Sequence, residues 1–257
     1  VKQDINKTIF YLTKAAKLNN AISQFNLGYI YYSGSLVPRD IDKAIYYYTL
    51  SANLNYLRAQ FNLAQIYIEG IYVTRDINKA IYYYEQSAKN GFPIALYNIG
   101  VIHYHKKNMD KALHYFNLSA KKNGKDAQYV LGGLYEKGKL IPRDINKAIQ
   151  YYLSAAKQGH SHAQFCLAKL YINGIHVEKN IDKAINFLLL AAKQDHRDSF
   201  FYLGVLYQRG GPISRDINKS IHYYKEITSF GDQYAKNNLG IIYKNGFGGL
   251  KNNYYAF

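Results

Sequence analysis

The sequence predicts an all-α solenoid built from about seven helical hairpins. Three observations lead to this fold class: a segment that recurs at a near-constant interval, apolar residues at helical spacing inside each interval, and no linker between one interval and the next. Of the 257 residues, 48% are hydrophobic and 16% are aromatic, whereas a disordered chain combines low hydrophobicity with high net charge. The composition is therefore that of a folded chain.

Two independent sequence patterns, called registers here, recur along the chain. The first is the tetrapeptide Asp-Ile-Asn/Asp-Lys or a close variant, and the second is a Leu/Ile-Gly/Ala pair with an aromatic residue or His three positions after the small residue. Both registers advance by 36 residues, except for one step of 32 in the third unit, where residues 105–108 replace a longer turn. A fixed period of this length indicates stacked supersecondary units. The lysines of the first register are Lys7, Lys43, Lys79, Lys111, Lys147, Lys183 and Lys219.

The first helix of each unit is represented by residues 58–69. Ala59, Leu63 and Ile66 fall at helical spacing and mark its buried face. The small residue after the Leu/Ile is most often glycine, which costs about 1 kcal/mol relative to Ala inside a helix, so we expect close approach of a neighbouring helix there. Each of these helices is expected to end at a glycine in the left-handed conformation. These glycines are Gly34, Gly70, Gly138, Gly174, Gly210 and Gly246.

The second helix of each unit is represented by residues 41–53. Its apolar face includes Ala44, Ile45 and Tyr48, and an aspartate before it is suited to cap the free backbone N–H groups of its first turn. These aspartates are Asp40, Asp76, Asp144 and Asp216. Asn or Gly closes the helix near Asn55, Gly91, Asn123, Gly159 and Gly231, and Asp195 is the exception.

Residues 1–257 are predicted to form one array, because a helical pair cannot bury its apolar face alone and must stack on its neighbours. Residues 246–257 are expected to be the turn and the opening of an eighth second helix that is cut short. The chain starts at Val1 and not at Met, so we expect a fragment of a longer protein.

The repeated pattern can be written Ala59-x3-Leu63-Ala64-x2-Tyr67-x2-Gly70-x5-Asp76-x2-Lys79-Ala80 and continues to Ser87-Ala88-x2-Gly91-x3-Ala95. It resembles the Sel1-like repeat, a relative of the tetratricopeptide repeat with a longer turn between its helices, and it occurs seven times in phase. The resemblance implies a right-handed α/α superhelical solenoid that acts as a non-enzymatic scaffold or adaptor for proteins or peptides. Two features depart from the family: Tyr or Phe stands where its second helix usually has Trp, and the repeat disulfides of secreted relatives are impossible here.

The composition favours a reducing compartment and acidic partners. A single cysteine, Cys166, suits a reducing, intracellular and cytoplasmic setting, and no apolar run approaches the roughly 20 residues of a membrane-spanning helix. The chain has 33 Lys and Arg against 17 Asp and Glu, a net charge of +16, which favours acidic partners. Its oligomeric state stays open.

A peptide-binding surface is expected on the first helices. By analogy with tetratricopeptide arrays, these helices line the concave face, where an Asn side chain presents both a donor and an acceptor to a peptide backbone and aromatic residues form apolar pockets. The alternative is that the same side chains serve packing between helices. The candidate residues are Phe25, Asn26, Phe61, Asn62, Gln65, Tyr97, Asn98, Tyr129, Phe165 and Phe201.

A basic edge is expected beside the second helices. Such a stripe fits an acidic protein segment or a membrane surface, and nucleic acid is an unlikely partner because no recognised nucleic-acid motif accompanies the charge. The alternative is a solvated face that only aids solubility. The residues of this basic edge are Arg39, Arg75, Arg143, Lys179 and Arg215.

No catalytic constellation, metal site or cofactor is predicted. His162 and Cys166 lie four residues apart on one helix and could form a nucleophilic pair, but no third group orients them. His103, His105 and His114 flank the short turn and could bind a metal, although solvated turn histidines are the expected reading. Two other functions stay open: a regulatory array of a larger protein whose catalytic domain, such as a protein kinase, lies outside this chain, and a basic scaffold on a membrane surface.

Overall fold

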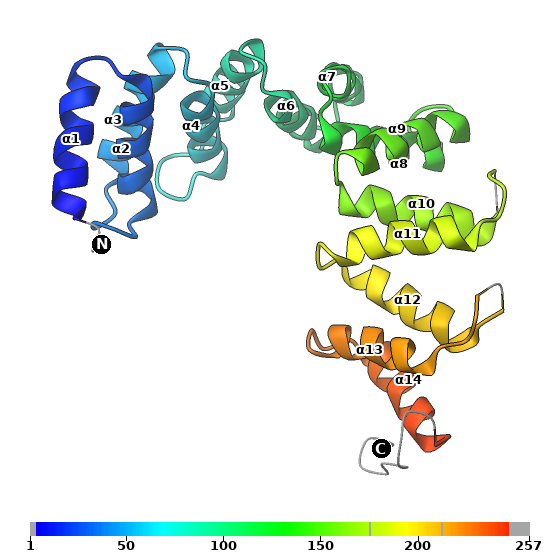
Figure 1. Cartoon of the computed structure of the whole chain (residues 1–257). Coiled ribbons are helices and arrows are strands. Elements are labelled where there is room, and N and C mark those ends of the chain that lie inside the picture. Colours follow the sequence, from blue (N-terminus) through cyan, green and yellow to red (C-terminus); the bar gives the residue numbers. More distant parts are fainter. Residues whose placement is uncertain (1–3, 175, 212, 247–257) are drawn as a thin grey trace. The chain divides into compact units, whose positions relative to one another are not determined.

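The computed structural model describes residues 4–174, 176–211 and 213–246, and over these ranges the chain folds into fourteen α-helices without a β-strand (Figure 1). The predicted all-α class is confirmed. The helices are α1 (Ile5–Lys17), α2 (Ala21–Ser33), α3 (Ile41–Asn53), α4 (Leu57–Glu69), α5 (Ile77–Lys89), α6 (Pro93–His105), α7 (Met109–Lys121), α8 (Lys125–Lys137), α9 (Ile145–Lys157), α10 (Ser161–Asn173), α11 (Ile181–Ala192), α12 (Arg197–Arg209), α13 (Ile217–Thr228) and α14 (Gln233–Lys244).

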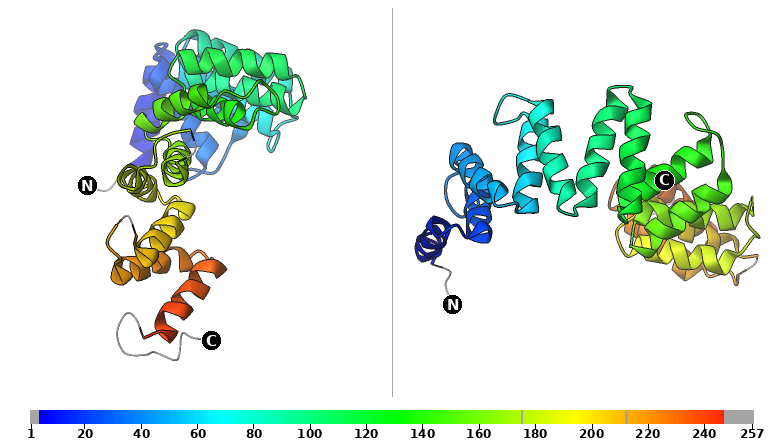
Figure 2. Two further views of the ribbon diagram at one scale, coloured as in Figure 1. Left: turned by 90° about the vertical axis from the view of Figure 1, so that its right-hand side faces the viewer. Right: turned by 90° about the horizontal axis from the view of Figure 1, so that it is seen from above.

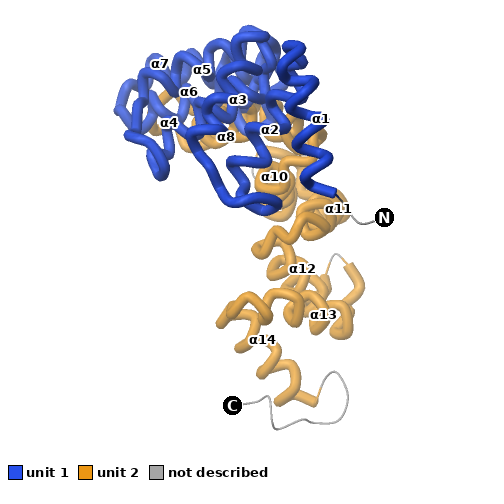
Figure 3. Tube along the Cα trace, turned by 90° about the vertical axis from the view of Figure 1, so that its left-hand side faces the viewer, with its two compact units in different colours: residues 1–127 blue, residues 128–257 orange. Residues whose placement is uncertain are grey.

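Hairpins pack in series within each of two compact units, which comprise residues 1–127 and 128–257 (Figure 3). In the first unit, the closest pairs are α2 with α3, α4 with α5 and α6 with α7, and each hairpin then packs on the next through α3 with α4 and α5 with α6 (Figure 2). The second compact unit, residues 128–257, shows the same order of packing from α9 to α14. The partial unit predicted at 246–257 lies, apart from Gly246, outside the described residues.

Aspartates cap the second helices as predicted. Asp40 accepts a 2.9 Å hydrogen bond from the backbone N–H of Lys43 through its side chain, and the Lys43 ammonium lies 2.9 Å from the same carboxylate and 5.2 Å from the centre of the Tyr31 ring. The short Asp-Ile-Asp-Lys segment at residues 40–43 therefore forms a helix cap, an exposed ion pair and a cation–π contact. The same cap forms at Asp4, Asp76, Asn108, Asp144, Asn180 and Asp216.

Left-handed residues end helices where the sequence places glycine or asparagine, except that Gly210, with φ 69° and ψ −144°, lies outside the left-handed region predicted for it. Gly70 has φ +64°, and a Cβ atom there would lie 2.6 Å from the Cβ of Arg75, so the conformation and the close approach both require glycine. In the short third unit α6 runs to His105 and Lys107 takes φ 57° instead. Asp195, the exception in sequence, takes the same conformation as Asn55, with φ 57° against 60°.

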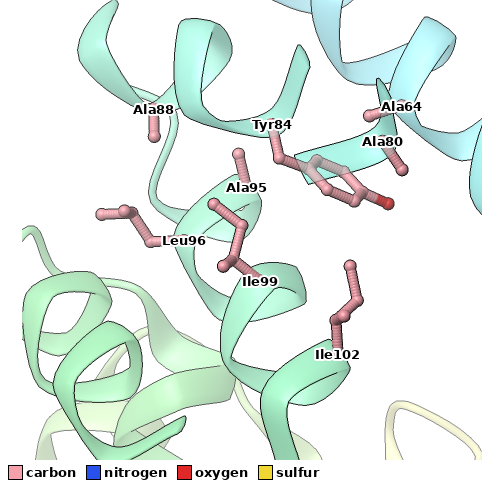
Figure 4. Packing of buried hydrophobic residues seen from close by; sticks show 8 residues of the cluster. All are labelled: Ala64, Ala80, Tyr84, Ala88, Ala95, Leu96, Ile99 and Ile102. Carbon is pink, nitrogen blue, oxygen red and sulfur yellow. The ribbon is translucent and has the colours of Figure 1, made fainter. Parts of the chain in front are cut away.

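Aromatic rings from the second helices form the centre of most hairpins, and Leu188 takes their place in α11. The ring of Tyr48 is fully buried, and a Cβ atom on Gly28 would lie 2.6 Å from its Cδ1 atom. The close approach predicted at the small residue is therefore made by a ring and not by a helix backbone. Figure 4 shows the corresponding cluster around Tyr84, with Ala64 at the position of the glycine.

Buried polar side chains connect helices both within a hairpin and between consecutive hairpins. The Gln60 side-chain amide donates to the carbonyl of Ala52 at 3.1 Å, and the Ser51 hydroxyl donates to the carbonyl of Ala21 at 2.7 Å. The first bond joins α4 to α3 of the preceding hairpin, and the second joins α3 to α2 within one hairpin, so each gives a buried polar side chain a backbone acceptor. Equivalent bonds start from Gln24, Gln164, Ser87 and Ser119.

Candidate functional site

A hollow of about 240 Å³ opens on the first compact unit, between helices α2, α3 and α4. It contains several of the residues expected to bind a peptide, including Phe61, Asn62 and Gln65. Half of its lining residues are aromatic, and its polar groups are two amides, three tyrosine hydroxyls and one carboxylate. The lining residues are Tyr29, Tyr32, Tyr48, Phe61, Asn62, Gln65, Ile66 and Glu69.

Two of the amides in this hollow also bond to buried tyrosines. Asn62 donates to the Tyr48 hydroxyl at 3.1 Å, and Gln65 accepts a hydrogen bond from the Tyr84 hydroxyl. Burial raises the pKa of Tyr48 and of Tyr84 to about 12, so both phenols are neutral at physiological pH. Part of the polar surface assigned to a ligand therefore has a structural role as well.

Three asparagines, each directly before a Leu or Ile, hydrogen-bond to a tyrosine hydroxyl of the preceding second helix, whereas Cys166 stands at this position after Tyr152. Asn98 bonds to Tyr84 and Asn238 to Tyr224, whereas Val130 and Tyr202 occupy this position in the units that follow Phe116 and Leu188. The pairing is visible in the sequence once position 48 and position 62 are compared. Sequence reasoning missed it because it treated each helix separately.

Asn26 differs from Asn62 and Asn98. The residue that matches Tyr48 one repeat earlier is Leu12, which has no hydroxyl, and within the described chain no hydrogen bond engages the Asn26 side chain. Asn26 is half-buried. Its amide can therefore serve a ligand without loss of an internal bond.

The predicted aromatic residues are half-buried, and all but Phe165, which packs on His196, lie beside the central ring of their own hairpin. Phe61 lies 5.5 Å from Tyr84 and 5.1 Å from Phe92, measured between ring centres. Each offers a ligand only part of its ring. The corresponding contacts are Phe25 with Tyr48, Tyr97 with Phe116, Tyr129 with Tyr152, Phe165 with His196 and Phe201 with Tyr224.

Tyr29, Tyr32 and Glu69 complete the hollow, and the sequence analysis did not single them out. Tyr29 is 55% exposed. Burial, followed by the nearby Glu69 carboxylate, raises the pKa of Tyr32, whose hydroxyl hydrogen-bonds to that carboxylate. Tyr29 and Glu69 have no like residue at the equivalent positions of the other repeats, and Tyr32 has one only at Tyr104, so periodicity does not indicate them.

The basic edge lies on exposed turns, and two of its arginines reach the following turn. Arg39 donates to the Tyr72 hydroxyl and, at 3.2 Å, to the carbonyl of Ser33. Arg143 donates to the carbonyl of Glu136 at 3.1 Å and lies 3.4 Å from the His176 ring nitrogen. These arginines link consecutive turns. Arg75 and Lys179 are also exposed, and Arg215 lines a hollow of about 350 Å³ beside α13.

Cys166 and His162 do not form a nucleophilic pair. Burial raises the pKa of the Cys166 thiol, which hydrogen-bonds to Tyr152, whereas the His162 ring packs against His196 with 4.7 Å between ring centres. Burial also lowers the pKa of His196. A neutral thiol without a base is a weak nucleophile.

The three histidines near the short turn each contact a tyrosine ring, which for His105 is that of Tyr104. His103 lies within α6 and stacks on Tyr115 with 5.6 Å between ring centres, and His114 packs edge-on against the same ring. Across the described ranges there is no group of three His, Cys, Asp or Glu side chains able to hold a metal ion. In the same part of the chain, each helix is too short or too polar to span a bilayer.

Comparison with known proteins identifies the repeat. A sequence profile of the Sel1 repeat matches residues 1–20, 21–56, 57–92, 93–124, 125–160, 161–196, 201–227 and 233–257. From residue 21 to residue 196 these borders fall between the hairpins, and the 32-residue repeat is among them, whereas the match at 201–227 begins inside α12 and ends inside α13. No curated protein matches the chain in a sequence search.

Two solved structures share the fold. A protective antigen of uropathogenic Escherichia coli strains, described as displaying an SLR fold, has a TM-score of 0.84 and 26% identity over 96% of this chain and 54% of its own. This chain thus spans about half the length of that protein. A Sel1 repeat protein from Oxalobacter formigenes has a TM-score of 0.85 and 26% identity over 94% of this chain and 72% of its own. Profile and structures agree, and the chain belongs to the Sel1 repeat family.

Proposed function

We propose that the chain is a scaffold that binds proteins or peptides through the first helices of its first compact unit, α2, α4 and α6. One observation carries this proposal: the 240 Å³ hollow lies on the expected residues Phe61, Asn62 and Gln65. Ligand pockets combine apolar walls with a few convergent polar groups, and this hollow has both.

The chemistry of the surface suits an extended peptide. The Asn26 amide offers one donor and one acceptor, and the exposed Tyr29 ring offers apolar area and a hydroxyl. Aromatic residues in partly desolvated pockets commonly carry most of the binding free energy at interfaces. We therefore expect a side-chain anchor in the hollow and backbone hydrogen bonds beside it.

Selection from a displayed library of random peptides tests the proposal. Selected peptides should lose about ten-fold or more in affinity for Tyr29→Ala, as expected when an interface aromatic is truncated, and should bind Tyr82→Ala normally. The control is matched, since Tyr29 and Tyr82 are each 55% exposed. The proposal would be contradicted if the selection yielded no peptide, or if the selected peptides bound the Tyr29→Ala variant with unchanged affinity.

Two narrower statements accompany this function. We place the protein in the cytoplasm, because its single cysteine suits a reducing compartment. We also assign no catalysis to these repeats, because the Cys166 thiol bonds to Tyr152 and not to a base.

A further inference from the structure

Glu69 breaks the repeat at a position where local structure does not favour it. It is the last residue of α4, and a carboxylate at that end of a helix faces the negative pole of the helix dipole. Its equivalents in the other units are neutral or basic. They are Ser33, His105, Lys137, Asn173, Arg209 and Asn245.

Tyr29 breaks the repeat in the same hollow. Its ring is exposed and therefore adds little to the core, although exposing a large aromatic surface to water is unfavourable. No other unit has an aromatic residue at its position. The equivalents are Gln65, Val101, Gly133, Lys169, Val205 and Ile241. Residues that violate local rules without a structural gain are candidates for a functional role.

The carboxylate of Glu69 has no cationic partner within the described residues. The nearby Arg39 guanidinium is directed instead to the Tyr72 hydroxyl and the Ser33 carbonyl. Glu69 accepts from the Tyr32 hydroxyl, which leaves further lone pairs for a ligand. In a chain of net charge +16, Glu69 therefore places a negative charge without an ion-pair partner among the described residues in a hollow lined by aromatic rings.

We propose that this hollow binds the side chain of a lysine or arginine from the bound peptide, with its cation paired to Glu69 and its methylene groups and cation against Tyr29, Tyr32 and Phe61. This inference rests on the proposed function and names the anchor that the peptide supplies. Aromatic faces attract cations, and carboxylates form charge-assisted hydrogen bonds with ammonium and guanidinium groups. Because the chain carries a net charge of +16, the favoured peptide has one basic anchor in an otherwise neutral or acidic segment.

A pair of small probes tests the anchor directly. Nα-acetyl-lysine N-methylamide and the norleucine analogue have the same backbone and similar chain length but differ in charge. Titration of each into the isotope-labelled chain, followed by NMR of backbone amides, should place the lysine probe at residues 29, 62 and 69. The lysine probe should bind about five-fold more tightly, the sum expected from an exposed cation–π contact and a surface ion pair.

Two variants and two matched controls complete the experiment. Glu69→Gln and Tyr29→Leu should each weaken the lysine probe about three-fold, as the loss of one such contact predicts, and leave the norleucine probe unchanged. Glu178→Gln and Tyr82→Leu change an exposed carboxylate and an exposed tyrosine elsewhere and should have no effect. Equal affinity for both probes, or an equal loss in Glu178→Gln, would overturn the assignment.

The outcome separates this inference from the function on which it rests. Selected peptides that depend on Tyr29 but contain no lysine or arginine would leave the peptide scaffold standing and refute the cationic anchor. Glu69-dependent binding of the lysine probe without any selected peptide would support the anchor and contradict the peptide scaffold.

Discussion

The side-chain amide of Asn62 donates a 3.1 Å hydrogen bond to the hydroxyl of Tyr48, a residue of the preceding hairpin whose ring is fully buried. The same relationship joins Asn238 to Tyr224 at 3.0 Å. A buried hydroxyl without a partner costs more than the bond itself contributes. The pair therefore explains why asparagine stands at position 62 and why it need not recur in every unit.

Removal of either partner alone should destabilise the chain, and removal of both should cost less than the sum. Asn62→Val leaves the Tyr48 hydroxyl unpaired, at a cost of about 1 to 3 kcal/mol, and Tyr48→Phe loses about 1 kcal/mol. The double variant has Phe at position 48 and Val at position 62. The chain itself has this combination at the equivalent positions, Phe116 and Val130. A double-mutant cycle from urea unfolding measures the coupling. Strict additivity would show that the hydrogen bond is not energetically significant.

Alkaline pH should destabilise the hairpins through their buried phenols. The pKa of Tyr48 and of Tyr84 is raised from 10.0 to about 12, so between these values the folded chain holds protons that the unfolded chain releases. Each phenol therefore contributes stability that is complete below pH 10 and is lost as the pH rises through about 12. Unfolding measured from pH 8 upward should show this fall, and Tyr84→Phe should make it shallower while the exposed Tyr82→Phe should not.

Gly132 and Gly133 should respond oppositely to alanine. A Cβ atom at Gly132 would lie 2.7 Å from the Tyr152 ring, whereas at Gly133 the nearest atom would be 3.6 Å away, an ordinary contact. Gly132→Ala should lower the free energy of unfolding by about 1 to 3 kcal/mol through overpacking. Gly133→Ala should raise it by up to about 1 kcal/mol, the difference in helix propensity. Thermal unfolding of both variants compares two neighbours in one helix, and equal shifts would refute the ring-packing explanation.

Deletion of residues 57–92, one complete hairpin, should leave a folded and shorter array, because each hairpin contacts only its neighbours. After the deletion, Asn98 takes the position of Asn62 relative to Tyr48, so the hydrogen bond between asparagine and the Tyr48 hydroxyl can still form. Deletion of residues 57–74 alone removes one helix and should not fold cooperatively. Circular dichroism during thermal unfolding distinguishes the two, and loss of helix after the whole-hairpin deletion would contradict nearest-neighbour stacking.

The sequence predicts the architecture well and the candidate site only in part. Caps such as Asp40 and left-handed residues such as Gly70 depend on neighbours within a few positions, so a local pattern identifies them. The contact of Arg39 with Tyr72 joins residues 33 positions apart, and no local pattern reveals it. The hollow depends on Tyr29 and Glu69, which depart from the repeat, and periodicity directs attention to the residues that keep it.

The hydroxyl pairing also sets where such an array can be recombined. Tyr48 and Asn62 lie on opposite sides of the border between two sequence repeats, which falls between residues 56 and 57. The two helices joined by this hydrogen bond are therefore a second helix and the first helix of the next repeat. An exchange of segments cut in the long turns, such as residues 34–40, transfers both partners together. A cut at the repeat border can leave a buried tyrosine facing valine, which would make otherwise similar hairpins incompatible.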